Sequence, residues 1–216
     1  MHFLTEKLQT GKNMSFLSLP YFSIANEIFG ENGNFCVHHD FIFCRIFAPL
    51  KILSLMPKEK INKTNACRIL DQKKVAYELI PYEVDENDLG AQHIADQLGE
   101  DINQVFKTLV LKGDKTGHFV CVIPGNDEVD LKKTAKVTGN KSCDLIPMKE
   151  LLPLTGYVRG GCSPVGMKKP FPTFIHETCQ LFDYIYVSAG VRGLQFKLNP
   201  QHLIDLVGMT VADLTV

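Results

Sequence analysis

The chain has 216 residues, an apolar fraction of 45%, a charged fraction of 22% and a formal net charge of −1 at pH 7. This length and composition suit one globular domain with its own core, or one domain and an appendage. The near-neutral charge argues against tight, autonomous binding to a nucleic-acid backbone, which usually needs a clustered excess of Lys and Arg.

Residues 1–56 differ from the rest of the chain. They are rich in Phe, Leu and Ile, but they show neither a sustained helical period nor clean strand alternation. Their apolar run 41–55 is interrupted by charged residues and a proline, and it falls short of the roughly 18 residues that a membrane span requires. We interpret 1–56 as an N-terminal extension, either poorly ordered or read from a misplaced start, and 57–216 as the working domain. No membrane partner is expected.

The seven cysteines form no C-x-x-C pair, and several lie inside apolar runs, as Cys121 does. This pattern is typical of buried, reduced thiols in a cytoplasmic protein. The cluster of Cys and His between Cys36 and Cys44 fits no standard zinc spacing. We therefore expect neither a metal nor a cofactor.

The first half of the domain is expected to contain a helix, an extended segment, a helix and a helical turn at 65–74, 75–84, 91–98 and 101–104. Asn62 or Thr64 can cap the first helix, and Gly99 is suited to end the second. Pro81 has no N–H for a sheet ladder, which indicates an edge strand. Asp101 can cap the turn that follows.

Two apolar strands, 106–112 and 118–123, follow with a glycine-bounded hairpin loop between them. Asp130 is expected to cap a helix that reaches about Val137. The remaining expected elements are a strand at 143–146, a helix at 148–152, extended segments around Tyr157 and at 173–176, 184–188 and 194–198, and a helix at 200–207. Strands and short helices mix without strict βαβ alternation. The pattern therefore predicts an α+β fold, with a mixed, mostly antiparallel sheet or a partly closed barrel surrounded by short helices.

Residues 156–166 form the most informative segment, Gly-Tyr-Val-Arg-Gly-Gly-Cys-Ser-Pro-Val-Gly. Glycine permits positive φ and close approach of another molecule, and successive free N–H groups can form a nest for an anion or a polarised carbonyl. Most loops of this kind are only turns, so the segment alone does not assign a function.

Three segments in this order carry a resemblance to a known family: the Phe-Lys-Thr-Leu-Val-Leu run at 106–111, the glycine-rich loop at 156–166, and the Asp-Tyr-Ile-Tyr-Val-Ser-Ala-Gly-Val-Arg-Gly run at 183–193. Together they resemble the YbaK/EbsC family of aminoacyl-tRNA deacylases, which is related to the editing domain inserted in bacterial prolyl-tRNA synthetases. The resemblance covers roughly residues 62–208. It implies cleavage of the ester between a wrong amino acid and tRNA, with Cys-tRNA(Pro) as the substrate.

The resemblance also implies roles for individual residues. Lys107 would position the substrate as a cation, whereas without the family it would be read as a solvated lysine on a sheet face. Gly160 and Gly161 would offer backbone N–H groups to the aminoacyl end, with Gly161 counted beside Lys107 as catalytic. Ser188 would contact the substrate from the end of its strand.

Other candidates keep two readings. Ser163 could add a hydroxyl to the substrate site or be a turn residue before proline. Tyr82 could cover the pocket or be half-buried structure. Asp183 could pair with a lysine in the site or merely begin its strand. The pair Lys168–Lys169 could meet acceptor-stem phosphates or lie in a solvated turn.

Cys162 stands where the family usually has an aliphatic residue, and we interpret it as an apolar substitute and not a nucleophile. His93 and His176 are read as structural. The sequence shows no convincing Ser-His-Asp or Cys-His arrangement. This fits the mechanism that the resemblance implies, in which the thiol of the substrate cysteine attacks its own ester to give a thiolactone and free tRNA.

Mischarged tRNA is the expected partner, bound weakly by this chain alone because of the near-neutral charge, and we hypothesise that the chain works beside prolyl-tRNA synthetase. Two alternatives stay open. One is an Ala-tRNA(Pro) or Ser-tRNA deacylase that uses water as the nucleophile. The other is a non-catalytic module that binds aminoacyl groups or a small anion.

Overall fold

The structure, a computed structural model, describes residues 63–216, so the expectations for residues 1–62 lie outside it. The described part contains the helices α2 (Asn65–Gln72), α3 (Ala91–Leu98), α4 (Leu131–Val137), α5 (Met148–Thr155) and α6 (Pro200–Val207), with the 3-10 turns η3 (Ile102–Gln104) and η4 (Glu177–Leu181). None of these helices has the length and apolar character to cross a bilayer.

Its strands are β1 (Glu78–Pro81), β2 (Phe106–Gly113), β3 (Gly117–Pro124), β4 (Cys143–Leu145), β5 (Thr173–His176), β6 (Ile185–Ser188), β7 (Leu194–Leu198) and β8 (Thr210–Ala212). They form two open sheets, of order β1-β7-β6 and β4-β2-β3-β5-β8. All pairs are antiparallel except β3–β5 and β5–β8. The predicted α+β fold with a mixed, mostly antiparallel sheet is confirmed, and the sheets are open.

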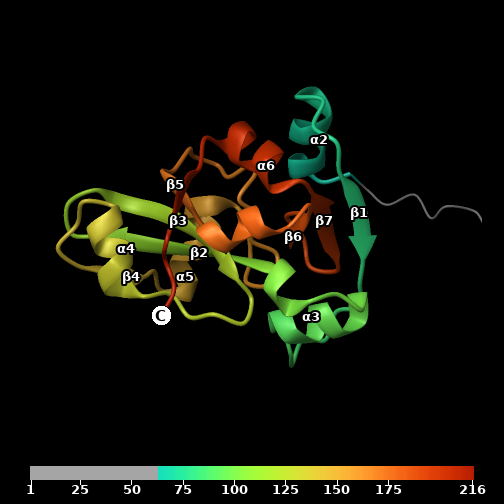
Figure 1. The fold of residues 1–216 in the computed structure, drawn as a ribbon, viewed down its shortest axis with the longest axis horizontal. Helices are drawn as coiled ribbons and strands as arrows, with labels where there is room; N and C mark the ends of the chain where they lie inside the picture. The colour runs from blue at the N-terminus through green and yellow to red at the C-terminus, as the bar shows by residue number, and fades with distance from the viewer. Residues whose placement is uncertain (1–62) are drawn as a thin grey trace, which may run out of the picture. The chain divides into compact units, whose positions relative to one another are not determined.

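The two sheets meet at an isolated bridge between Val105 and Tyr186, just before β2 and inside β6. Figure 1 shows α2 and α3 beside β1 at one end of the domain, and α4 and β4 at the other. The hairpin of β2 and β3 therefore connects the two ends. Its first residues, where the Phe-Lys-Thr-Leu run begins, lie where the sheets come together.

Side-chain caps begin the helices where the sequence predicts them. The Thr64 hydroxyl accepts the Cys67 N–H, and the Asp130 carboxylate accepts N–H groups of the first turn of α4. Asp101 caps η3 in the same way, and Gly99 ends α3 with a φ of 66°. Pro81 ends β1, which lies at the edge of its sheet as predicted.

The structure departs from the sequence prediction around Tyr157. The expected extended segment there forms no strand, because α5 continues to Thr155 and Gly156 then turns the chain with a φ of 85°. The Tyr157 side chain points inward, and its hydroxyl donates a 2.6 Å hydrogen bond to the Val165 carbonyl. Strand β8 and the turn η4 were not expected from the sequence, because each is short and β8 pairs only with the distant β5.

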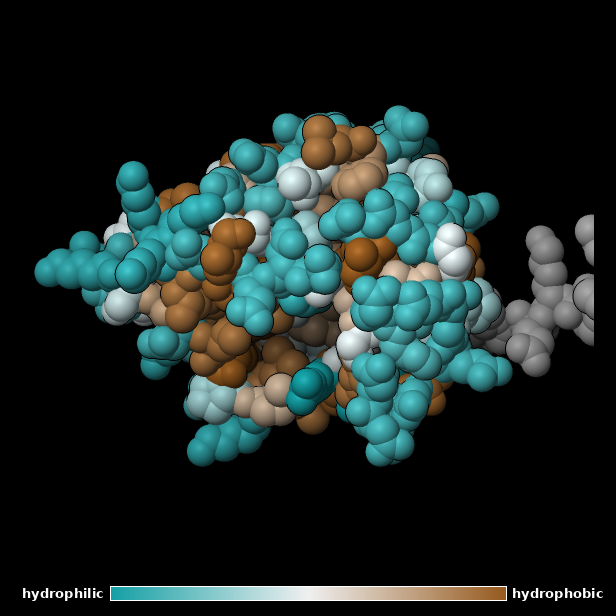
Figure 2. Space-filling view, turned by 60° about the horizontal axis from the view of Figure 1, so that its bottom comes forward, coloured by the Kyte–Doolittle hydropathy of each residue, from teal (hydrophilic) through white to brown (hydrophobic). Residues whose placement is uncertain are grey.

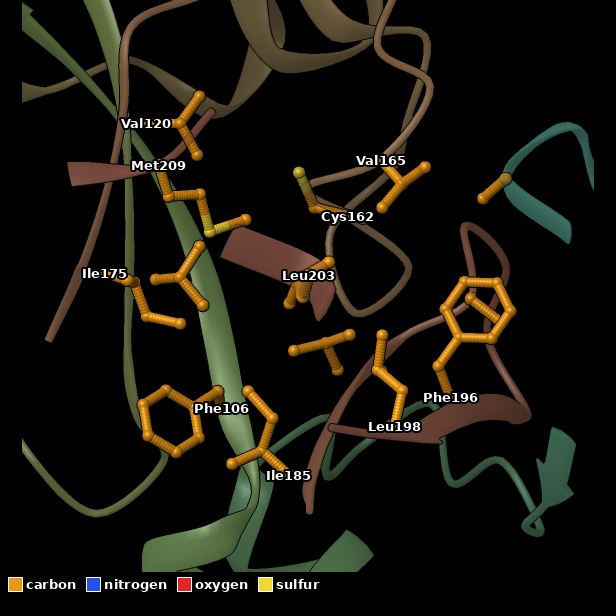
Figure 3. Packing of buried hydrophobic residues seen from close by; sticks show 14 of the residues in the cluster. Phe106, Val120, Cys162, Val165, Ile175, Ile185, Phe196, Leu198, Leu203 and Met209 are labelled. Atoms are coloured by element: carbon orange, nitrogen blue, oxygen red, sulfur yellow. The ribbon is translucent and has the colours of Figure 1, made fainter. Parts of the chain in front are cut away.

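The main core lies between the two sheets and α6. Figure 3 shows Phe106 from β2, Ile185 from β6, Phe196 from β7 and Leu203 from α6 among the side chains of this one buried cluster. Burying side chains of this size contributes roughly 1.5–3 kcal/mol each. Three residues of the glycine-rich loop, Tyr157, Cys162 and Val165, belong to the same cluster. The loop is thus anchored by the core and is not a free surface loop.

Candidate functional site

A cavity of about 570 Å³ opens between the start of β2, the glycine-rich loop, the strands β6 and β7, and α5. Its size lies within the range of small-molecule sites, roughly 300–1,000 Å³. Much of the wall is apolar, and Figure 2 shows apolar side chains gathered around a hollow in one face of the molecule. The polar and glycine residues that line it include Lys107, Thr108, Gly125, Arg159, Gly160, Ser188 and Gln195.

Lys107 enters this cavity from β2. Its Nζ donates a 3.0 Å hydrogen bond to the Gly125 carbonyl, the only hydrogen bond that it makes within residues 63–216. Burial lowers the pKa of Lys107, while the nearby carboxylates of Asp127 and Glu128 act in the opposite direction. An ammonium has three donors, so two remain for a ligand.

Gly125 holds the acceptor of Lys107 and was not singled out from the sequence, where Pro124-Gly125 looks like an ordinary turn. A Cβ at this position would overlap the Ala91 side chain and lie 2.8 Å from the Val105 carbonyl oxygen. The Gly125 N–H donates to that same oxygen at 2.7 Å. The close approach of two backbone segments therefore requires glycine, and it fixes the carbonyl that orients Lys107.

The two adjacent glycines of the loop have different roles. Gly160 has a φ of 79° and lines the cavity, and its N–H has no acceptor within the described residues. Gly161 lies behind it, and its N–H donates to the Val158 carbonyl at 3.0 Å. A Cβ on Gly161 would lie 3.1 Å from backbone atoms of Val191 and Arg192. Gly161 thus lets the loop pack against 189–193, and Gly160 is the one with a free donor.

The loop is also tied to its neighbours by side chains. Arg192 donates from Nε to the Arg159 carbonyl at 2.9 Å, which joins the loop to the segment after β6. Tyr157 closes the loop through its bond to Val165, and burial raises the pKa of Tyr157 to about 12. Arg159 itself lines the cavity, although the sequence suggested no role for it. The wall that carries the free N–H is therefore held in place before any ligand binds.

The structure separates the four remaining sequence candidates. Ser188 lines the cavity, and its Oγ accepts the Gly190 N–H at 3.3 Å. Ser163 is fully buried inside the loop, where its Oγ accepts the Val165 N–H in a local turn. Tyr82 packs with the residues around α3. Asp183 is exposed, and its carbonyl accepts from Asn199. Of these four, only Ser188 lines the cavity.

Two buried polar atoms in residues that line the cavity have no hydrogen-bond partner within the described residues, Oγ1 of Thr108 and Oε1 of Gln195. Gln195 is only 3% exposed and lies directly opposite Ser188 in the β6–β7 register. An unpaired buried acceptor costs roughly 1–3 kcal/mol, so its retention suggests a donor from a ligand. Sequence reasoning missed Gln195 because one polar residue in an alternating strand is usually solvated.

The alternative nucleophile and bases are not set up for catalysis. Cys162 lines the cavity but is largely buried, and this burial raises the pKa of its thiol to about 12, so it is not a ready thiolate. The His176 Nδ1 accepts the Leu214 N–H at 3.1 Å, which ties down the C-terminal segment. His93 contacts Gln97 within α3. Neither histidine lines the cavity.

Comparison with known proteins identifies the family of the chain. Residues 86–206 match the aminoacyl-tRNA editing domain family. Over 161 residues the chain is 47% identical to "Putative Cys-tRNA(Pro)/Cys-tRNA(Cys) deacylase EbsC" of Enterococcus faecalis. This match covers 74% of this chain and 98% of that protein. Over 78 residues it is 32% identical to the proline–tRNA ligase of Fervidobacterium nodosum, covering 36% of this chain and 13% of that one.

The fold is shared with solved structures. A protein described as "a putative trans-editing enzyme for prolyl tRNA synthetase" superposes with a TM-score of 0.62 and 25% identity, covering 71% of this chain and 98% of that one. The hypothetical protein APE2540 superposes with a TM-score of 0.64 and 21% identity, covering 69% of this chain and 97% of that one, so it has the same fold.

Proposed function

The chain belongs to the aminoacyl-tRNA editing domain family, and on this premise we propose that it is a trans-editing deacylase that removes a wrongly attached amino acid from tRNA. Its preferred substrate is Cys-tRNA(Pro), in line with the name of its Enterococcus faecalis relative. Such an activity answers a limit of recognition. A synthetase pocket cannot strongly reject a residue of similar size, so a second site must sort the product.

One observation carries the proposal. Lys107, Gly160 and Ser188 come from three segments far apart in the sequence, and all line the same cavity. These are the three segments that resemble the deacylase family. A cation, a free backbone donor and a hydroxyl around one apolar hollow can hold an aminoacyl ester and keep water from most of it.

The polar groups suggest how the ester would lie. The Lys107 ammonium and the Gly160 N–H are the donors for the ester carbonyl, where negative charge develops during cleavage. The unpaired oxygens of Gln195 and Thr108 are acceptors for the α-ammonium group of the amino acid. This assignment gives each otherwise unsatisfied group in the wall a partner of opposite polarity.

The chemical step is assigned to the substrate. The thiol sulfur of the bound cysteine forms a bond to its acyl carbon, and the bond between that carbon and the ribose oxygen breaks. The thiol proton passes to the departing oxygen, so the products are a thiolactone and free tRNA. The high pKa of the Cys162 thiol supports a reaction that needs no nucleophile from the protein. Alignment of reacting groups alone can lower a barrier by roughly 7–11 kcal/mol.

The direct test is a deacylation assay with Cys-, Ala- and Ser-charged tRNA(Pro), run on the wild type and on Lys107→Ala. We expect fastest release from Cys-tRNA(Pro) and loss of release in the variant. Preference for Ala- or Ser-tRNA(Pro) would instead assign water as the nucleophile. Binding of aminoacyl groups with no release above the buffer rate would make the chain a binding module and end the proposal.

The synthetase partner is part of the same proposal. With a net charge of −1, the chain has no overall positive field to bind a whole tRNA, so prolyl-tRNA synthetase would make most of the contacts with the tRNA body. We expect deacylation of Cys-tRNA(Pro) at low enzyme concentration to rise when the synthetase is added. Nanomolar binding of tRNA by the chain alone, in physiological salt, would contradict this arrangement.

A further inference from the structure

Helix α5 separates the cavity from a second hollow, a groove of about 440 Å³. Met148 and Leu151 of α5 line the cavity. The groove is lined from the same helix by Lys149, Glu150, Pro153 and Leu154, and from outside it by His118 and Lys169. Successive helical residues are rotated by about 100°, so the two sets lie on opposite faces of α5. The helix is thus a wall common to both hollows.

The groove is basic, although the chain as a whole is nearly neutral. Lys149 and Lys169 are both exposed, and neither has a carboxylate within 4.0 Å among residues 63–216. Glu150 is the single acidic residue in the lining. His118 adds a ring nitrogen, Nε2, that is buried without a partner in the described part of the chain. Two cations without partners in a shallow hollow favour a phosphate-bearing ligand.

An apolar ridge lies between the cavity and the groove. Met148 is 56% exposed and Leu152 is 51% exposed, and the two are one helical turn apart. By the rotation along α5, Leu152 follows Met148 on the side that leads to Lys149. Leu145, just before the helix, is also exposed and lines the cavity mouth. Exposed apolar side chains of this kind are suited to contact the face of a base.

On the side of the glycine-rich loop, Arg192 already donates to the Arg159 carbonyl, and its guanidinium lies 3.7 Å from the Glu86 carboxylate. Arg159 is an exposed cation that lines the cavity itself. A charged strand that leaves the cavity across α5 meets the uncommitted cations of the groove. The helix is only roughly 10–12 Å wide with its side chains, so a single strand crosses it within a few nucleotides.

We propose that the single-stranded 3′ end of the substrate tRNA crosses the outer surface of α5, and we call this binding surface the saddle. The terminal adenosine lies over Met148 and Leu152, and Lys149 and Lys169 bind backbone phosphates of the nucleotides before it. This inference rests on the proposed deacylase function, because it is the ester in the cavity that sets where the strand begins. The site recognises RNA phosphate and no base sequence.

The test compares two substrates that carry the same ester, a full aminoacyl-tRNA and the 3′-O-aminoacyl-adenosine, which has no phosphate. The variant is Lys149→Gln with Lys169→Gln in the full chain. Its matched control is Lys132→Gln with Lys136→Gln, which removes the same charge from the exposed side of α4. We expect the groove variant to raise KM for the tRNA by about tenfold. We also expect it to reduce the slope of log KM against log salt by about 1.4, because two phosphate contacts are lost and each contributes about 0.7 on a single strand.

The adenosine ester keeps the two proposals apart. If the wild type releases amino acid from neither substrate, the deacylase function fails. If the wild type is active but the groove variant changes KM for tRNA no more than the α4 control does, the saddle is wrong and the function stands. An equal loss on both substrates also overturns the saddle, because the lysines would then act on the cavity and not on phosphate.

Discussion

The two sides of α5 use lysine in opposite ways. On the cavity side, Lys107 is half-buried, fixed to the Gly125 carbonyl, and surrounded by a wall that keeps polar atoms without partners. On the groove side, Lys149 and Lys169 are exposed and have no carboxylate partner in the described part of the chain. A fixed cation in a poorly solvated wall can stabilise developing charge, whereas an exposed one mainly attracts phosphate. The contrast predicts different losses from the same kind of substitution.

Lys107→Ala is expected to have the largest effect. Loss of a preorganised donor to a developing oxyanion costs about 10²–10³ in kcat. Because Lys107 is assigned to the ester itself, the loss should be equal on aminoacyl-tRNA and on aminoacyl-adenosine, measured by single-turnover release. Lys107→Met keeps the length of the side chain and controls for packing. A Lys107 variant impaired only on tRNA would place this lysine with the groove cations and break the comparison.

Gln195→Met should lower activity and raise stability at once. The substitution removes the proposed acceptor for the α-ammonium group. We expect a loss of about tenfold in kcat/KM, which corresponds to the loss of one charge-assisted hydrogen bond. It also removes a buried unpaired oxygen, so the free energy of unfolding should rise by about 1 kcal/mol. Urea denaturation measures the second effect. Reduced stability together with full activity would show that the amide has a structural partner.

At alkaline pH, loss of the proton from Lys107 on the cavity side of α5 should lower the rate of release by a few fold, at a pH where the exposed lysines of the groove are still charged. Burial lowers the pKa of Lys107 below its ordinary value of 10.5, so the buried ammonium loses its proton before an exposed lysine does. Release from aminoacyl-adenosine, corrected for the rate in buffer, should therefore fall as the pH rises through this lowered pKa. The residual activity of Lys107→Arg should lack this fall, because arginine stays charged. A fall that persists in Lys107→Arg would assign it to another group.

The fold was largely predictable because its signals are local. The hairpin of β2 and β3 follows from two apolar runs around a glycine-bounded loop, and Asp130 marks the start of α4 from its own side chain. The error at Tyr157 is also local, since Gly156 takes a left-handed conformation that apolar patterning does not reveal. Strand β8 depends on pairing with a strand more than thirty residues earlier, which no local pattern contains.

The site was predictable only in part. Lys107, Gly160 and Ser188 belong to segments with a recognisable order of residues, and they line the cavity. Gln195 and Gly125 were missed because their roles depend on what lies across from them. A strand's alternation does not show that Ser188 will oppose Gln195, and Pro124-Gly125 looks like a turn until Ala91 is packed against it. Long-range packing, which the sequence encodes only collectively, decides both.

Cys162→Ala should have the smallest effect. Cys162 belongs to the glycine-rich loop and packs into the core, and burial raises the pKa of its thiol to about 12, so at pH 8 it is almost entirely protonated. We expect kcat within about twofold of the wild type, with a modest loss of stability from the removed sulfur. Iodoacetamide should leave Cys162 unlabelled in the folded protein, as peptide mapping can show. If a folded Cys162→Ala protein were as inactive as Lys107→Ala, the protein and not the substrate would supply the attacking sulfur, and the cavity side of α5 would need a nucleophile as well as a cation.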